Sequence, residues 1–145
     1  MKYLLDASAL LPLATRTGKQ LTAEAARADL FTTDLAVYEA CNGLWKLATL
    51  LKTITPEDAA DIAGILHELT ARELVKTITF TVIDLPHTLS IAQKAKVTFY
   101  DASYIEVAQR ISATLITEDQ KLRKAASNSV KTMSFVQLQK ELAKI

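Results

Sequence analysis

The chain has 145 residues, of which 50% are hydrophobic and 23% are charged. This is the composition of an ordinary globular domain, and at this length folding buries roughly 70% of the surface of the unfolded chain. We therefore expect residues 1-145 to form one domain. Lysine and arginine number 17 against 16 for aspartate and glutamate, which excludes the strongly basic balance that by itself marks a nucleic-acid binder.

Cysteine content and hydropathy bear on the compartment. Cys41 is the only cysteine, so neither an intramolecular disulfide nor a cysteine-based zinc site is expected. Asp6 interrupts the apolar run at the N-terminus, whereas a signal peptide needs an unbroken apolar stretch of about 7–15 residues. No stretch approaches the roughly 18 apolar residues of a membrane span. These features predict a cytoplasmic protein.

Short apolar runs alternate with longer helical patterns along the chain. In the first half, strands are predicted at residues 3–5 and 31–32, and helices at residues 22–30, 34–51 and 56–74. The third helix has the strongest start, because Pro56 suits a first turn and Glu57 and Asp58 lie at the positive end of the helix dipole. Thr33 or Asp34 can cap the helix before it.

The second half continues the alternation. Strands are predicted at residues 77–83, 114–117 and 130–133, and helices at residues 86–96, 101–112, 119–126 and from residue 134 or 135 onward. In the first of these strands Ile78, Phe80 and Val82 alternate with threonines, which is the period of a strand. Strands that alternate with helices indicate an α/β fold with a mainly parallel sheet, because a sandwich or barrel needs more glycine and proline.

Three aspartates lie at the ends or starts of these elements. Asp6 directly follows the first strand, Asp119 lies two residues after the strand at 114–117, and Asp101 begins a helix. Taken singly, each would most often be a helix cap worth about 1 kcal/mol. Parallel sheets, however, gather their ligands at the carboxyl ends of the strands, so the convergence of three acids favours a shared site.

The predicted helix over residues 34–51 carries a fourth acid. The helix is apolar on most of its surface and is therefore expected to be mostly buried. Glu39, Asn42 and Lys46, spaced i, i+3 and i+7, form its polar stripe. That stripe is either a solvated face with weak ion pairing or part of the acidic site.

A cluster of four carboxylates would need a cation. Two carboxylates about 4 Å apart repel by roughly 4 kcal/mol at an effective dielectric constant near 20. Either their pKa values rise or a metal ion neutralises them. An all-oxygen site suits Mg²⁺ or Mn²⁺ rather than zinc. His67 and His87 are expected to be surface or structural residues, because neither has a partner His or Cys nearby in the sequence.

Four segments of the chain together resemble the PIN-domain family, most closely the VapC-type toxin ribonucleases. They are Leu4-Leu5-Asp6-Ala7-Ser8, Tyr38-Glu39-Ala40-Cys41-Asn42, Tyr100-Asp101-Ala102-Ser103-Tyr104 and Leu115-Ile116-Thr117-Glu118-Asp119-Gln120-Lys121-Leu122. Each motif alone is weak, but their order and spacing from residue 4 to about 125 are specific. The resemblance implies a PIN-like three-layer α/β/α fold with a short, mainly parallel central sheet. It also implies metal-dependent endoribonuclease activity.

The resemblance further implies a set of site residues. The residues that match the family's acidic quartet, and would hold one or two Mg²⁺ or Mn²⁺ ions, are Asp6, Glu39, Asp101 and Asp119. Ser8 and Thr117 match positions where a hydroxyl often supports the site. Asn42 and Glu118 are further supporting candidates. Glu118 ranks behind Asp119, because adjacent residues at a helix start usually diverge.

RNA contacts are less readable than the acidic site. The basic residues placed to hold phosphates are Lys46, Lys121 and Arg123, with Lys124, Arg16 and Lys19 as further candidates. Ordinary surface charge is the alternative for each of them. Aromatic stacking platforms are sparse, so the sequence predicts no base recognition.

Four residues near these motifs have expected packing roles. Cys41 and Trp45 are expected in the core, Cys41 because it lies on the apolar stripe of its helix. Tyr100 and Tyr104 are expected to pack around the site or at a subunit interface.

Partners follow from the resemblance alone. It implies a small antitoxin protein and a homodimer, and exposed apolar surface on residues 59–74 is the expected antitoxin groove. One alternative is a PIN nuclease for RNA processing without an antitoxin. Another is a non-nuclease, Mg²⁺-binding acidic-pocket domain such as a phospho-receiver. A receiver normally carries paired acids after its first strand, where this chain has Asp6 followed by Ala7 and Ser8.

Overall fold

A five-stranded parallel sheet forms the centre of the fold. The computed structural model describes residues 1–16 and 19–145, and of residues 19–21 only the backbone. The strands in this part are β1 (Lys2–Leu5), β2 (Asp29–Thr33), β3 (Lys76–Ile78), β4 (Thr114–Ile116) and β5 (Thr132–Met133). They lie in the order β3-β2-β1-β4-β5, and every neighbouring pair is parallel. The predicted parallel sheet is therefore confirmed.

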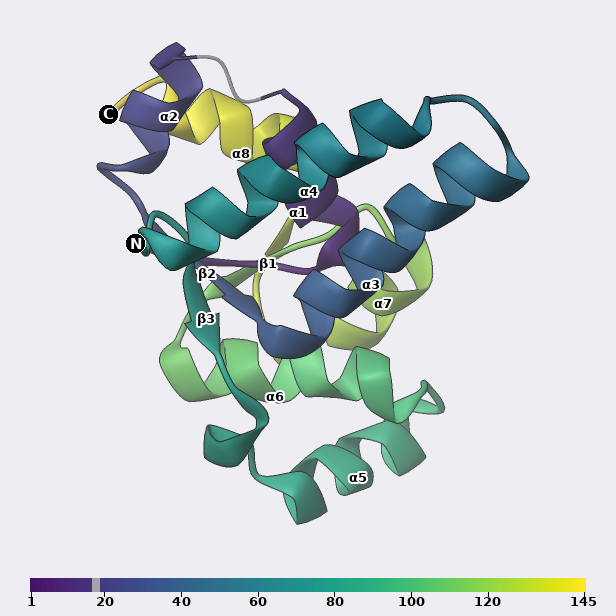
Figure 1. Ribbon diagram of the computed structural model, residues 1–145. Helices are drawn as coiled ribbons and strands as arrows, with labels where there is room; N and C mark the ends of the chain where they lie inside the picture. The colour runs from purple at the N-terminus through teal and green to yellow at the C-terminus, as the bar shows by residue number, and fades with distance from the viewer. Residues whose placement is uncertain (17–18) are drawn as a thin grey trace.

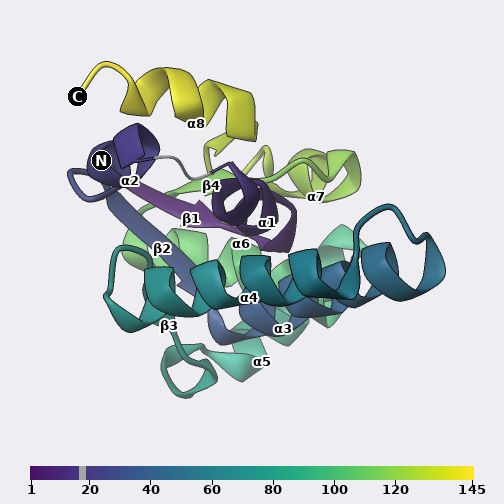
Figure 2. The same ribbon diagram turned by 45° about the horizontal axis from the view of Figure 1, so that its top comes forward.

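Helices cover both faces of this sheet. The α-helices that the described residues form are α1 (Ala7–Thr15), α2 (Lys19–Ala25), α3 (Asp34–Trp45), α4 (Pro56–Ala71), α5 (Leu85–Ala95), α6 (Phe99–Ile111), α7 (Gln120–Ala126) and α8 (Phe135–Leu142). A π-helical turn, Lys46–Leu50, continues α3. Figure 1 shows α5 and α6 on one side of the sheet and α1, α4 and α8 on the other. This confirms the three-layer architecture. Figure 2 shows α3 and α4 running side by side, and the two helices are in contact.

Capping side chains set where several helices begin. The Thr33 hydroxyl accepts a hydrogen bond from the backbone N–H of Ala36, which starts α3. Thr55 and Asp58 form a reciprocal capping box at the start of α4. Ser134 caps α8 in the same manner. These starts agree with the sequence predictions, because a cap depends on residues only a few positions apart.

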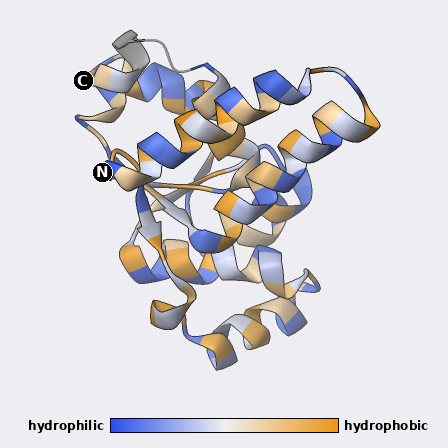
Figure 3. Cartoon of the chain, viewed as in Figure 1, coloured by the Kyte–Doolittle hydropathy of each residue, from blue (hydrophilic) through white to orange (hydrophobic). Residues whose placement is uncertain are grey.

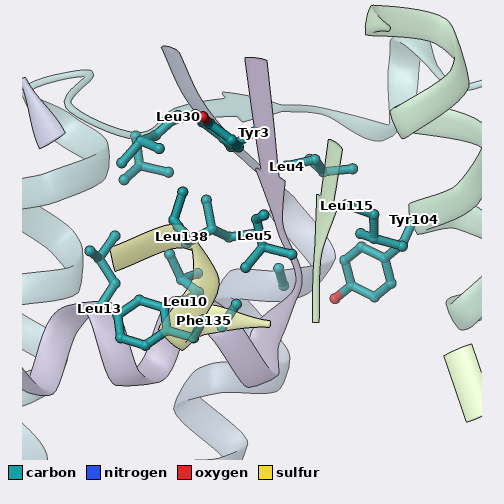
Figure 4. Close-up of a cluster of buried hydrophobic side chains, with 14 of the residues drawn as sticks. Tyr3, Leu4, Leu5, Leu10, Leu13, Leu30, Tyr104, Leu115, Phe135 and Leu138 are labelled. Carbon is teal, nitrogen blue, oxygen red and sulfur yellow. The ribbon is translucent and has the colours of Figure 1, made fainter. Parts of the chain in front are cut away.

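The core forms on both faces of the central strands. Successive side chains of a strand point to opposite faces. Figure 4 accordingly shows Leu4 on the side of Leu115 and Tyr104, and Leu5 on the side of Leu138. All five side chains are at most 4% exposed. Figure 3 shows hydrophobic and hydrophilic residues mixed along the helices that cover these strands.

Two predicted elements were wrong in extent. The helix expected over residues 22–30 ends at Ala25, because residues from Asp29 onward pair with β1 as β2. The strand expected over residues 77–83 ends at Ile78 and is followed by a 3₁₀ turn, Phe80–Val82. Ile78 pairs with Thr33, the last residue of β2, so the sheet offers no partner further along.

The buried face of α3 also differs from the prediction. Ala36, Ala40 and Leu44 are its buried residues, whereas Cys41 is exposed and Trp45 is 50% exposed. The reason is α1, a helix that was not predicted from the sequence and that packs against α3. Small residues permit that close approach, so the larger side chains of α3 lie outside. The expectation that α3 is mostly buried, with Cys41 and Trp45 in the core, was wrong.

Both histidines of the chain lie at the surface. His67 on α4 and His87 on α5 are both exposed, in agreement with the surface role expected for them. Among the described residues no helix is long and apolar enough to cross a membrane.

Candidate active site

The carboxyl ends of three neighbouring strands lie level at one edge of the sheet. Leu5 pairs with Ile116, so Asp6 and Thr117 come next on β1 and β4, and the N–H of Asp6 donates to the carbonyl of Ile116 at 3.2 Å. The last residue of β2, Thr33, lies on the other side of β1. This is the edge at which parallel sheets bind ligands.

Asp6 is the most deeply buried acid at this edge, with 4% of its surface exposed. Its carboxylate accepts hydrogen bonds from the Ser8 hydroxyl at 2.6 Å, from the Ala9 N–H at 3.1 Å and from the Thr117 hydroxyl. Burial raises the pKa of Asp6 most, these hydrogen bonds oppose the rise, and the charge of Asp119 adds to it. Asp6 is thus an oriented carboxylate that gains from a nearby cation.

Asp119 lies one strand away and caps α7. Its Oδ1 accepts hydrogen bonds from the N–H groups of Lys121 and Leu122, at 2.9 and 3.2 Å. Its own N–H donates to the Thr117 hydroxyl oxygen at 3.0 Å. The capping role considered for this residue is therefore present, and Thr117 joins Asp119 to Asp6. The cap engages Oδ1 and leaves Oδ2 without a hydrogen bond among the described residues.

Asp101 lies in the first turn of α6 and is half-buried. Its pKa is raised first by burial, then by the charges of Asp119 and Glu39, while the charge of Lys121 lowers it. Because Coulombic effects fall with distance, the structure brings Asp101 into electrostatic range of acids from α3 and from the β4–α7 connection.

Glu39 approaches from α3 and is held by a residue of α6. The hydroxyl of Tyr104 donates to Glu39 Oε1 at 2.5 Å. Tyr104 is 3% exposed, and its pKa is raised by burial, by the hydrogen bond to Glu39 and by the charges of Glu39 and Asp6. From the sequence, Tyr104 was expected to pack around the site or at a subunit interface, and its hydrogen bond to Glu39 was not predicted. Its position one turn after Asp101 on the same helix was the available signal.

The four acids form a chain of electrostatic neighbours rather than a closed cage. The neighbouring pairs are Asp6 with Asp119, Asp119 with Asp101, and Asp101 with Glu39. Within residues 1–16 and 19–145 no three His, Cys, Asp or Glu side chains are close enough to hold a metal ion as they stand. Like charges repel, and several of these carboxylates turn to local donors instead. The donor set is all oxygen, which fits Mg²⁺ or Mn²⁺.

The four supporting candidates have different surroundings. The Ser8 hydroxyl donates to Asp6, accepts from the Glu118 N–H at 2.9 Å and lies 3.4 Å from the Thr117 hydroxyl. The carboxylate of Glu118 turns elsewhere, since its Oε1 accepts the N–H of Phe135 at 2.5 Å. Asn42 lines a cavity together with Glu39. Ser8 and Thr117 therefore contact the acids directly, whereas Glu118 holds the start of α8.

The basic candidates are also divided. Lys46 lines the same cavity as Glu39. The positive charge of Lys121 lowers the pKa of Asp101. Arg123 is engaged by the backbone, since its Nη2 donates to the Thr117 carbonyl at 2.6 Å. Lys124 lines a second cavity of about 550 Å³ with Lys121.

Two of the further basic candidates lie elsewhere. The Arg16 guanidinium lies 5.9 Å from the centroid of the Phe135 ring. The side chain of Lys19 falls outside the described residues.

Comparison with known proteins agrees with this fold. Residues 3–128 match the PIN domain model. The chain is 35% identical over 126 residues to Ribonuclease VapC3 of Pyrobaculum aerophilum, covering 84% of this chain and 92% of that protein. It is 36% identical over 126 residues to Exonuclease VapC9 of the same organism, covering 84% of each. The crystal structure of PAE2754 from Pyrobaculum aerophilum superposes with a TM-score of 0.76 at 29% identity, covering 100% of this chain and 91% of that one. The chain therefore belongs to the PIN-domain family, as a nuclease of the VapC group.

Proposed function

We propose that the chain is a Mg²⁺- or Mn²⁺-dependent endoribonuclease and the toxin of a VapBC-type pair. The observation that carries the proposal is the meeting of acids at one edge of the sheet, where the Thr117 hydroxyl donates to Asp6 and accepts from the N–H of Asp119. The charges of Asp119 and Glu39 also raise the pKa of Asp101, after burial. Acids that disfavour one another's ionised forms gain most from a divalent cation. The relative named Ribonuclease VapC3 supports RNA as the substrate.

The residues have distinct parts in phosphodiester hydrolysis. When bound, the divalent ion lowers the pKa of a water molecule and stabilises charge on the phosphate. Asp6, Glu39, Asp101 and Asp119 supply the oxygens that hold it. Ser8, Thr117 and Tyr104 donate hydrogen bonds that orient two of these carboxylates, Asp6 and Glu39. Partners of this kind typically affect metal affinity by about 10–100-fold when they are removed.

Phosphates must approach a site that is acidic without its metal. Lys121 lies close enough to Asp101 to lower its pKa, and Lys46 lines the cavity beside Glu39. These lysine side chains attract the RNA and keep its phosphates near the acids, because most of the affinity for nucleic acid is electrostatic.

Cleavage of labelled single-stranded RNA tests the nuclease. The purified protein should cut in Mg²⁺ or Mn²⁺ and stop in EDTA, and Asp101→Asn should lose at least about 100-fold in rate, in line with about 2.7 kcal/mol of lost transition-state stabilisation. Asp61→Asn, an exposed acid on α4, is the matched control and should cut normally. Equal cutting by Asp101→Asn and Asp61→Asn would contradict the assigned site.

A circular single-stranded RNA separates endonuclease from exonuclease activity. It has no end, so only an endonuclease linearises it. The comparison matters because one relative is named an exonuclease. Cutting of the linear strand alone would replace the endonuclease proposal with an exonuclease.

The toxin role includes a small antitoxin and a homodimer. On α4, where the antitoxin groove is predicted, Ile65 is 37% exposed. Exposed apolar side chains at the end of α3 and just beyond it, Trp45 at 50%, Leu50 at 60% and Leu51 at 65%, add surface for such a partner. Expression should arrest growth, and co-expression of a small protein encoded next to it should restore growth. Normal growth with active RNA cleavage would favour the alternative of an RNA-processing nuclease without an antitoxin.

A further inference from the structure

A cavity of about 490 Å³ between α3 and α6 adjoins the acidic residues. Glu39 is part of its lining. Two other lining residues, Ala7 and Tyr100, are the chain neighbours of Asp6 and Asp101. Any group held in this cavity is therefore next to the bond that the proposed nuclease cuts.

Two exposed aromatic rings line this cavity from different helices. Tyr38 on α3 is 77% exposed and Tyr100 on α6 is 60% exposed. A single exposed hydrophobic residue is normal, but two aromatic rings that the fold brings to one cavity form a local apolar surface. Unpaired bases of RNA are held by stacking on such rings.

The other lining groups suit the rest of a nucleotide. The Asn42 side-chain amide offers both donors and an acceptor, which is what the edge of a base requires. The Lys46 ammonium can hold a phosphate. The volume is also sufficient, because sites for small ligands usually measure about 300–1,000 Å³.

We propose that this cavity is a base subsite, which holds one unpaired nucleobase of the RNA beside the scissile phosphate. The base stacks on Tyr38 and Tyr100, Asn42 contacts its edge, and Lys46 contacts an adjoining phosphate. The inference rests on the proposed nuclease function. A base subsite explains why Tyr38 and Tyr100 are exposed next to the acids. It also predicts a preference for single-stranded RNA, whose bases are unpaired.

Fluorescence of 2-aminopurine, a base whose emission falls when it stacks, tests the subsite. The probe is a short single-stranded RNA that carries this base at each position in turn, bound in Mg²⁺ to Asp101→Asn so that the strand remains whole. Quenching should occur at one position or two adjacent ones. Adding Tyr38→Leu or Tyr100→Leu should abolish it and weaken binding by about 5- to 150-fold, the range for loss of one base–aromatic stack.

Matched variants separate stacking from a general effect on the surface. Tyr38→Phe and Tyr100→Phe keep the ring and should retain the quenching. Trp45→Leu removes another exposed aromatic ring of α3 that does not line the cavity, and it should also retain the quenching. A strand that is abasic at the quenched position should bind equally to the parent and to Tyr38→Leu.

The results that overturn the subsite differ from those that overturn the nuclease. If the wild-type chain cuts RNA but the leucine variants bind and quench like their parent, the subsite is wrong and the nuclease stands. If those variants change only the oligomeric state, the tyrosines serve a protein interface instead. If the wild-type chain neither cuts nor binds RNA in Mg²⁺, the proposed function fails and the subsite fails with it.

Discussion

The pKa of Asp101 depends on the charges of two other acids of the site. Its pKa is raised by burial and by the charges of Asp119 and Glu39, so its ionised form is disfavoured in the folded chain. Stability linked to this group is present below its unfolded pKa, near 3.9, and is lost as the pH rises through the higher folded pKa. At neutral pH the acid therefore destabilises the metal-free fold.

We predict that Asp101→Asn is more stable than the wild type in EDTA at neutral pH. Asp101 is only half-buried, so solvent screens the effect to below about 1 kcal/mol, or about 1–3 °C in Tm. The gain should disappear as the pH falls toward about 4, where the wild-type acid becomes protonated. Thermal unfolding followed by circular dichroism at both pH values measures it.

Added Mg²⁺ provides the control for that prediction. A ligand that binds only the folded state raises its stability, so Mg²⁺ should stabilise the wild type more than Asp101→Asn. A variant that melts below the wild type in EDTA at neutral pH would show that Asp101 does not repel its neighbours.

Tyr104 is the residue whose importance the structure adds to the site. Its hydroxyl donates to Glu39, so Tyr104→Phe should leave the ring packed while freeing that carboxylate. We predict about a tenfold weaker Mn²⁺ affinity, since removing a residue that hydrogen-bonds to a metal ligand usually lowers the affinity by at least that much. Electron paramagnetic resonance of free Mn²⁺ measures it without cleavage. Tyr38→Phe, an exposed tyrosine, should bind Mn²⁺ normally.

At the scale of single elements, α8 depends on a residue from outside the helix. Glu118 Oε1 accepts the N–H of Phe135, the first residue of α8, and a negative charge there also suits the helix dipole. Glu118 was predicted from the sequence as a supporting residue of the metal site. Its carboxylate instead joins the β4–α7 connection to the next helix.

We predict that Glu118→Ala lowers the free energy of unfolding by about 1 kcal/mol, as loss of a helix cap does. Glu118→Gln keeps an acceptor oxygen and should retain most of that stability. Urea unfolding measures both variants, and Mn²⁺ affinity should be unchanged in each. Weaker Mn²⁺ binding by both would return Glu118 to the metal site.

The elements that the sequence misread were decided by their neighbours. The apolar stripe of α3 indicates a buried helix only if something covers it, and α1 covers the face of small residues instead. The alternating pattern after Thr77 indicates a strand only while a partner strand is present. β2 ends at Thr33, so the pattern continues as the turn at Phe80–Val82.

At the scale of the whole molecule, α8 completes the core although the PIN domain match ends at residue 128. Phe135, Leu138 and Leu142 are each at most 2% exposed. Full burial of one such side chain contributes about 1.5–3 kcal/mol. Three together are comparable to the total stability of a domain, about 5–15 kcal/mol.

We predict that a chain truncated after Met133 loses cooperative unfolding or aggregates. Circular dichroism with thermal unfolding, and size-exclusion chromatography, measure the outcome. Removal of Lys144 and Ile145 alone, two exposed residues beyond α8, should leave the Tm within a few degrees. A truncated chain that melts at the wild-type Tm would show that α8 is dispensable.

Local signals in the sequence were enough to predict most helix starts and the parallel sheet. They also placed Asp6, Asp101 and Asp119 at strand ends or helix starts, because periodicity and caps depend on residues only a few positions apart. The position of Tyr104 one turn after Asp101 indicated that it lies near the site, but no local pattern indicated its contact with Glu39 or the meeting of Tyr38 with Tyr100 at one cavity. Residues far apart in the chain make these contacts only after helices and strands have packed. Side-chain direction then depends on which neighbour covers which face, and this is a property of the tertiary structure alone.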